Sequence, residues 1–257
     1  MAKIKTLLNL IKDKVETLPP EQSFLADLKA TVSACNPHRK GSKSFKPSSL
    51  QCARQNYFVK IDAPLDACMP DYSGQRICET GSSSHESIQY YVSQMQKHGK
   101  PCEWVDVETY IRDHGLTYLE IRGKKDFETK LYDTRYDISF LCDGIIRYKG
   151  KCYILEIKTE TDSKGLYREE ADMYHKNQSV AYSLALKIND VMWIYEERNF
   201  CVPKTFHTVV TEEDRVKLIM FFEEVLQAVK DMKPPKKCTS RKTCEYCRYK
   251  SICRQYS

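Results

Sequence analysis

Hydrophobic positions along the chain change their spacing from a helical pattern to an alternating one and back. In five stretches the apolar residues recur every three or four positions, which is typical of amphipathic helices. Helices are therefore expected over residues 3–16, 50–58, 81–98, 169–187 and 212–232. We predict that Ser48 and Ser49 cap the second helix, Ser82 to Ser84 the third and Thr211 the last. Residues 33–49, rich in Ser, Pro, Lys and Gly, are expected to form a loop.

Much of the chain between the third and fourth helices alternates apolar with polar residues, which predicts strands with one buried face. Strands are expected over residues 104–111, 117–121, 127–131, 136–141 and 152–157, and two more over 191–196 and 205–210. Turns are predicted at His114-Gly115, Gly123-Lys124 and Lys149-Gly150. This order of elements predicts an α/β fold, with a mixed central sheet flanked by helices.

The predicted core covers residues 81–232. Residues 1–80 are expected to form an N-terminal helical segment and residues 233–257 a C-terminal tail, all packed as one domain. With 257 residues, 41% of them hydrophobic, the chain can build one sizeable core. No stretch approaches the roughly 18 consecutive apolar residues of a membrane span, so we expect a cytoplasmic protein with no membrane partner.

Basic residues gather near both ends of the chain, whose net charge is +6. Residues 233–254 contain eight Lys and Arg residues against one acid, Glu245, and a second basic group precedes residue 47. Basic residues gathered in this way favour a polyanionic partner. An ordinary solvated surface has the same composition, so charge alone leaves both interpretations open.

The chain contains twelve cysteines, a high number for its length. Its first residues predict an amphipathic helix and not a secretory signal, so we expect the clustered cysteines to bind metal in preference to forming disulfides. Cys142 and Cys152 lie in apolar, strand-like runs and are expected to be core residues. Four thiols of the tail would suffice for a structural zinc ion: Cys238, Cys244, Cys247 and Cys253.

Two carboxylates and a lysine lie on neighbouring predicted strands. Asp143 follows the apolar run 138–142, and Glu156 and Lys158 follow a turn at 148–151. Glu156 and Lys158 are two positions apart, so they face the same side of a strand, and pairing brings Asp143 beside them. Burying these charges is costly, and a bound Mg²⁺ or Mn²⁺ ion would offset that cost. The alternative is a surface strand pair with an exposed Glu and Lys.

Asp143 with Glu156-x-Lys158 resembles the catalytic motif of the PD-(D/E)xK nuclease superfamily, and two further motifs resemble its RecB-type branch. These are Gly81-x-x-x-His85 on the preceding helix and Gln178-x-x-x-Tyr182 on the following one. The resemblance implies a metal held by His85, Asp143, Glu156 and the Ile157 carbonyl. It implies that Lys158 assists the attacking water, and that Gln178 and Tyr182 position DNA or the active site. Glu128 is a further candidate carboxylate, and His175 a candidate for the helix face of Gln178.

Cys52 before the predicted core and Cys244-x2-Cys247-x5-Cys253 after it are similar to the cysteine pattern of RecB-type iron–sulfur nucleases, such as Cas4-like proteins and the AddB nuclease domain. The resemblance covers roughly residues 46–253. It implies a [4Fe–4S] cluster on these four cysteines, joining the two ends of the chain, with Cys238 left over.

The resemblance implies a Mg²⁺- or Mn²⁺-dependent deoxyribonuclease. Relatives of this type act as exonucleases on single-stranded DNA ends, in recombination, repair, viral replication or CRISPR adaptation. The implied partners are DNA, a second copy of the chain and recombination or replication proteins, in a bacterial or archaeal cell or encoded by a virus. The residues then expected to bind the phosphate backbone are Arg39, Lys40, Lys43, Lys242 and Arg248. Two alternatives are a catalytically silent DNA-binding module of the same fold and a zinc-stapled nuclease.

Overall fold

The computed structural model describes residues 19–36, 41–66, 72–161, 167–245 and 247–256. The chain divides into two compact units. The smaller comprises residues 1–40 and 68–80, and the larger comprises residues 41–67 and 81–257. All the described strands lie in the larger unit. The helix predicted over residues 3–16 lies outside the described residues.

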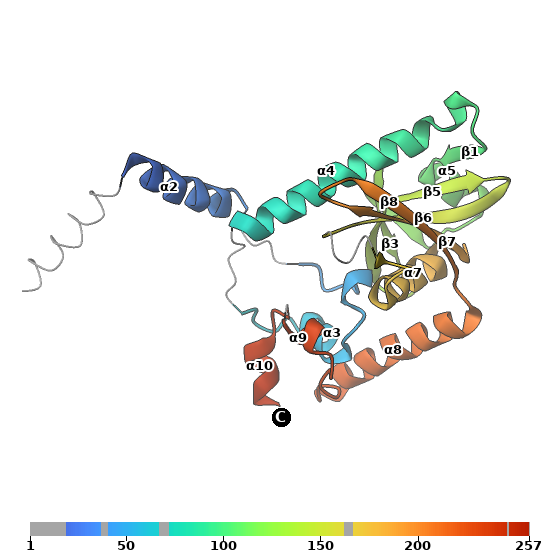
Figure 1. The fold of residues 1–257 in the computed structure, drawn as a ribbon. Helices are drawn as coiled ribbons and strands as arrows, with labels where there is room; N and C mark the ends of the chain where they lie inside the picture. Colours follow the sequence, from blue (N-terminus) through green and yellow to red (C-terminus); the bar gives the residue numbers. More distant parts are fainter. Residues whose placement is uncertain (1–18, 37–40, 67–71, 162–166, 246, 257) are drawn as a thin grey trace, which may run out of the picture. The chain divides into compact units, whose positions relative to one another are not determined.

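The larger unit is built on two sheets (Figure 1). The first has the strand order β1-β5-β6-β7-β8 and is mixed, because β6 and β7 are parallel while the other neighbours are antiparallel. Its strands are β1 (Cys102–Val105), β5 (Gly144–Tyr148), β6 (Lys151–Glu160), β7 (Asp190–Glu197) and β8 (Val202–Val209). The second sheet is antiparallel and consists of β2 (Leu119–Lys125), β3 (Glu128–Asp133) and β4 (Ile138–Cys142). The predicted α/β class with a mixed sheet is confirmed, and the separate second sheet was not predicted.

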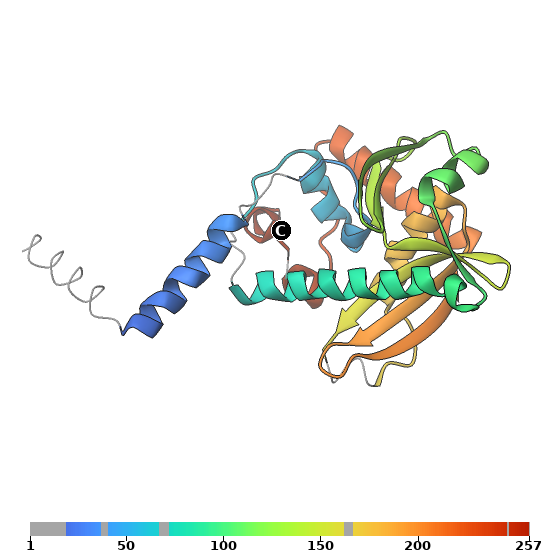
Figure 2. The same cartoon turned by 90° about the horizontal axis from the view of Figure 1, so that it is seen from above.

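Helices pack on both faces of the five-stranded sheet because its strands carry apolar residues on both sides (Figure 2). On one face, Ile88 and Val92 of α4 (Tyr72–Gln94) pack with Leu155 and Ile157 of β6. On the other, α7 (Met173–Leu186) packs with β6 and β7, and α8 (Glu212–Lys230) lies against α7. The remaining helices of the described residues are α2 (Pro20–Cys35), α3 (Ala53–Lys60), α5 (Val107–Asp113), α9 (Arg241–Glu245) and α10 (Lys250–Gln255), with 3-10 turns η1 (Pro47–Ser49) and η2 (Gln96–His98).

The strand predicted over residues 104–111 is wrong in its second half. The strand ends at Val105, and α5 follows it. The Asp106 side chain caps this helix, accepting a hydrogen bond of 2.9 Å from the Thr109 backbone N–H. Such a cap satisfies a backbone donor that the first turn leaves unpaired, so it favours a helix where the alternation alone predicts a strand.

Several other predicted boundaries differ from the structure. Gly123 and Lys124 lie within β2, and the chain turns instead near Asp126, whose φ is 51°. Helix α4 begins at Tyr72, so Ser82 to Ser84 lie inside the helix and do not cap it. Residues 33–35, predicted as the start of a loop, belong instead to α2, which ends at Cys35. Thr211 caps α8 as predicted, in a reciprocal capping box with Asp214.

The second predicted helix also starts later, and with another cap. Ser49 belongs to η1, and the Cys52 sulfur accepts the capping hydrogen bond of α3 from the Gln55 backbone N–H. The two strand-like cysteines are core residues, since Cys142 is fully buried and Cys152 packs against the same core. None of the described helices is long and apolar enough to cross a membrane.

Candidate functional site

Asp143 lies where the chain passes from β4 of one sheet to β5 of the other. The pairing of Gly144 with Leu155 brings Asp143 beside Glu156 on β6, as the sequence predicted. The Ile157 backbone N–H donates to Asp143 Oδ2 at 2.7 Å, and Gln89 Nε2 of α4 donates to the Asp143 carbonyl at 2.7 Å. Both contacts hold Asp143 in place and leave its Oδ1 for another partner.

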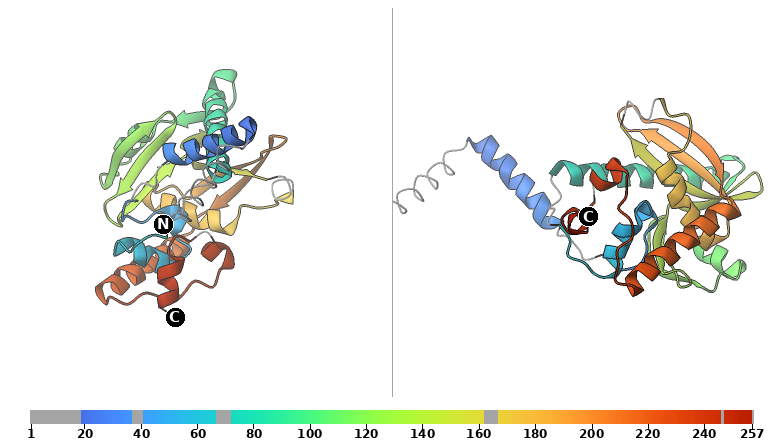
Figure 3. Two further views of the ribbon diagram at one scale, coloured as in Figure 1. Left: turned by 90° about the vertical axis from the view of Figure 1, so that its left-hand side faces the viewer. Right: turned by 90° about the horizontal axis from the view of Figure 1, so that it is seen from below.

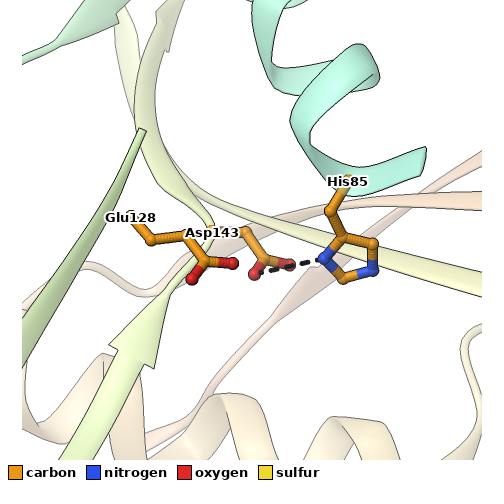
Figure 4. A group of neighbouring side chains, drawn as sticks. All are labelled: His85, Glu128 and Asp143. Atoms are coloured by element: carbon orange, nitrogen blue, oxygen red, sulfur yellow. Dashed lines mark ion pairs between the residues drawn. The ribbon is translucent and has the colours of Figure 1, made fainter. Parts of the chain in front are cut away.

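His85 and Glu128 join Asp143 in a group of three potential metal ligands (Figure 4). His85 comes from α4 and Glu128 from the first position of β3. One ligand atom from each of the three lies within 4.8 Å of the other two, and His85 Nδ1 is 3.6 Å from Asp143 Oδ1. This is the one such group of His, Cys, Asp and Glu residues in the described part of the chain. Imidazole nitrogen and carboxylate oxygen together suit a divalent cation such as Mn²⁺.

Burial raises the pKa of Glu128, and the neighbouring Asp143 carboxylate raises it further. A carboxylate whose ionisation is opposed by burial and by a neighbouring carboxylate is poised to accept a cation, because the cation's charge relieves the repulsion. The sequence singled out Glu128 only as a further candidate, whereas the structure sets it directly against His85 and Asp143.

Glu156 and Lys158 share a face of β6, and Glu156 is only 1% exposed. Glu156 Oε1 accepts hydrogen bonds from Lys158 Nζ at 2.5 Å and Gln178 Nε2 at 3.0 Å. Its other oxygen, Oε2, is buried and has no hydrogen-bond partner among the described residues. An acceptor left unpaired in the interior destabilises the fold, so a ligand that fills this position would bind favourably.

Burial and neighbouring charges together shift the pKa values of Glu156 and Lys158. Burial raises the pKa of Glu156 above its ordinary range; the Lys158 ammonium opposes that shift and Asp143 adds to it. Burial alone would lower the pKa of Lys158, but Glu156 and Asp143 outweigh it and raise that pKa. Lys158 therefore keeps its positive charge at neutral pH, beside carboxylates that need a counter-charge.

Gln178 and Tyr182 lie on one face of α7, as their spacing predicts. Gln178 Nε2 contacts Tyr182 OH at 2.5 Å in addition to Glu156. Tyr182 is 3% exposed and its ring packs against Phe140, with centroids 5.2 Å apart. Because it is buried, Tyr182 supports Gln178, and Gln178 in turn orients Glu156. The role of Gln178 and Tyr182 in positioning DNA or an active site stays a prediction.

Gln89, which fixes the Asp143 backbone, was not predicted from the sequence. Gln89 is fully buried, and its Oε1 has no hydrogen-bond partner among the described residues. Its position four residues after His85 places both on one face of α4, and this spacing was the available signal. Ile157 contributes its backbone N–H to the site, while its side chain packs toward α4. The role of the Ile157 carbonyl as a ligand stays a prediction.

The structure describes the side chains of only two of the five residues predicted to bind the phosphate backbone, Lys43 and Arg248. Lys43 is exposed and lies 3.7 Å from Asp62 Oδ2. Arg248 is half-buried, and its carbonyl accepts a hydrogen bond from the Asp66 backbone N–H at 2.8 Å. Arg39 and Lys40 lie outside the described residues, as does the side chain of Lys242. DNA binding by these five residues stays a prediction.

Five cysteines line one small cavity: Cys52, Cys238, Cys244, Cys247 and Cys253. All four predicted cluster ligands are therefore brought together. Cys238, which was not among the predicted cluster ligands, lines the same cavity. The described cysteines are free thiols. No three of these five sulfur atoms lie within 4.8 Å of one another. A single tetrahedral zinc ion needs sulfur–sulfur distances of about 3.8 Å, so the thiols would have to move inward to bind one.

The thiol of Cys52 is shielded from water. Burial raises the pKa of Cys52 to about 11; the Gln55 backbone N–H opposes this shift, and the nearby Cys238 and Cys247 thiols add to it. A thiol with this pKa is protonated at neutral pH and unreactive alone, whereas a bound metal would deprotonate it.

The C-terminal tail lies against α3 (Figure 3), and residues of both line this cavity. Arg54 of α3 donates from Nε to the Pro235 carbonyl at 2.6 Å and from Nη1 to the Tyr256 carbonyl at 2.7 Å. The ring of Phe58 lies 5.7 Å from that of Tyr249, centroid to centroid. Segments nearly two hundred residues apart in the sequence thus form one wall around the cysteines.

Comparisons with known proteins assign no family to the chain. No protein-family model matches the sequence, and no curated protein matches it. Among the solved structures that resemble the fold is one described as "Crystal structure of SSO0001". It is 16% identical in sequence, with a TM-score of 0.48, and the alignment covers 93% of this chain and 98% of that one. This similarity identifies neither a family nor a function.

Proposed function

We propose that the chain is a metal-dependent DNA nuclease. The observation that carries this proposal is the convergence of His85, Glu128 and Asp143, next to the strand position of Glu156, whose buried Oε2 has no hydrogen-bond partner among the described residues. His85 comes from α4, Glu128 from β3 and Asp143 from the junction between β4 and β5. Strand β6 adds the carboxylate of Glu156, whose pKa is raised by burial although the Lys158 ammonium opposes that shift. A divalent cation fits this donor set of one imidazole and three carboxylates.

In this proposal His85, Glu128, Asp143 and Glu156 hold the cation. When bound, Mg²⁺ or Mn²⁺ polarises the scissile phosphate and lowers the pKa of a coordinated water. Lys158 keeps its charge and can stabilise negative charge that develops on the phosphate. Gln178 donates to Glu156 Oε1, so only Oε2 is left for the cation, and Tyr182 fixes Gln178. The Ile157 N–H fixes Asp143 in the same way.

A labelled single-stranded oligonucleotide tests the activity, with Mn²⁺ or Mg²⁺ present. We expect the protein to degrade it, and Asp143→Asn, Glu128→Gln and Glu156→Gln each to slow degradation about 100-fold or more. Glu120→Gln, at an exposed carboxylate on β2, is the control and should have no effect. Labels at either end would give the polarity of digestion.

Metal binding is measured separately, by titrating Mn²⁺ into the protein and following its paramagnetic resonance signal. His85→Ala and Asp143→Asn should weaken binding, whereas Glu120→Gln should not. A protein that binds the strand but cuts it with neither metal would be the catalytically silent module, and the nuclease proposal would be wrong.

We further propose that the cysteine cavity holds a [4Fe–4S] cluster on Cys52, Cys244, Cys247 and Cys253. Support comes from the gathering of these reduced thiols around one space, and from the Gln55 N–H that can stabilise the Cys52 thiolate. Anaerobically purified protein should be brown and contain about four iron and four sulfide per chain. A colourless protein with one zinc ion would establish the zinc alternative instead.

A further inference from the structure

A groove of the larger unit runs between the carboxylate site and the cysteine cavity. Its volume is about 360 Å³, at the lower end of the range of roughly 300–1,000 Å³ found for small-molecule sites. Gln51 and Gln55 line it from around the start of α3, Tyr174, His175 and Gln178 from α7, and Thr243 from α9.

The groove is connected to both neighbouring sites. Gln178 is shared with the carboxylate site, because its amide also donates to Glu156. Gln55 and Thr243 line the groove and the cysteine cavity alike. Gln51 Nε2 donates to the Tyr174 carbonyl at 3.2 Å, and Tyr174 OH contacts Ser240 Oγ at 2.7 Å. These contacts join α3, α7 and the tail into one wall, so the groove has a defined shape.

The chemistry of the lining indicates what the groove binds. None of its described lining residues is an Asp, Glu, Lys or Arg, so a phosphate placed there would lack a cationic partner. Glutamine amides instead offer one acceptor and two donors, which matches the mixed donors and acceptors on the edge of a nucleobase. Tyr174 and His175 supply rings on which an unstacked base can pack.

We propose that this groove binds one unpaired base of the DNA strand, next to the phosphate at the carboxylates. The inference rests on the proposed nuclease function and adds a site for a base to it. Gln55 is the residue that best reports on the groove. Its side-chain amide makes no hydrogen bond in the described part of the chain, so it is available to a ligand. The backbone N–H of Gln55, which caps α3 through Cys52, is kept in Gln55→Ala.

The test measures binding without cleavage. A fluorescent single strand, with an abasic residue replacing one base at a time, is titrated with Asp143→Asn protein and followed by anisotropy. We expect loss of the base at one position to weaken binding about fivefold or more, as for a base that loses its stacking partner. Adding Gln55→Ala should remove this dependence on the base. Gln227→Ala, an exposed amide on α8, should leave the dependence unchanged.

Two outcomes overturn the inference. Equal affinity for every abasic strand, or a dependence that survives Gln55→Ala, would show that the groove holds no base. Cleavage of the unmodified strand by protein with Asp143 intact is measured in parallel. This measurement separates the two proposals. If the protein cuts the strand but binds every abasic strand equally, the nuclease proposal stands and only the base-binding groove is disproved. A strand that neither binds nor is cut overturns both.

Discussion

At the scale of single residues, the packing beside Asp143 depends on the absence of a side chain at Gly144. A Cβ there would lie 2.5 Å from Cη2 and 2.9 Å from Cζ2 of Trp104. The Trp104 ring also packs edge-on against Phe127, with centroids 5.3 Å apart, which limits its movement. We expect Gly144→Ala to lower the free energy of unfolding by about 1–3 kcal/mol, because the site would be overpacked. Urea denaturation measures this.

Gly81→Ala is the matched control. A Cβ at Gly81 would lie 3.5 Å from Thr159 Oγ1, an ordinary contact, and Gly81 lies inside α4. Because alanine favours a helix over glycine by about 1 kcal/mol, this variant should be as stable as the parent or more stable. Gly144→Ala should also weaken Mn²⁺ binding, since the strained position adjoins Asp143. Equal stability of the two variants would contradict the packing argument.

At the scale of elements, Asp190 links three neighbouring strands. It begins β7 and accepts hydrogen bonds from Lys151 of β6 at 2.8 Å and His207 of β8 at 2.7 Å. Burial raises the pKa of Asp190, but these two hydrogen bonds outweigh it and hold that pKa below its ordinary value. The carboxylate therefore contributes stability above the unfolded pKa of about 3.9, and this is lost as pH falls through the lower folded pKa.

We expect Asp190→Asn to cost about 1 kcal/mol at pH 7, a modest value because Lys151 and His207 are about half exposed. The difference from the parent protein should shrink below about pH 4, where the parent carboxyl becomes protonated as well. Urea unfolding at pH 7 and pH 3 measures both values. Asp113→Asn, at an exposed aspartate on α5, is the control and should behave like the parent at either pH. A pH-independent difference would show that the charge of Asp190 plays no part.

At the scale of the larger unit, Arg54 fastens the tail to α3. Arg54 is 8% exposed and donates to two tail carbonyls. Removing it leaves these carbonyls without their partner, and hydrogen bonds to charged groups contribute about 1.5–3 kcal/mol each. We expect Arg54→Ala to increase the rate of proteolysis within residues 236–256 at least tenfold, because the tail would detach more often.

Limited proteolysis with mass spectrometry measures this rate. Arg112→Ala, at an exposed arginine on α5, serves as the control. If the cysteines hold a cluster, Arg54→Ala should also lose iron faster in air than the parent does. Unchanged proteolysis of the tail would mean that ring packing around Phe58 and Tyr249 suffices to hold it.

Local periodicity in the sequence determined a substantial part of the site. Glu156 and Lys158 share a strand face because side chains alternate with period two, and Gln178 and Tyr182 share a helix face because they are four residues apart. The apolar spacing and the Thr211 cap likewise predicted α8 correctly. In each case the interaction lies within one element or one hairpin, where sequence separation fixes distance.

Only the tertiary structure decided how separate elements meet. Glu128 joins His85 and Asp143 because the three-stranded sheet meets the five-stranded sheet at Asp143, and no local pattern encodes that junction. Cys238 joins the other cysteines through the fold of the tail around Arg54, and the groove exists because α3, α7 and α9 converge. The sequence supplied the side chains of each site, and long-range packing determined which of them lie together.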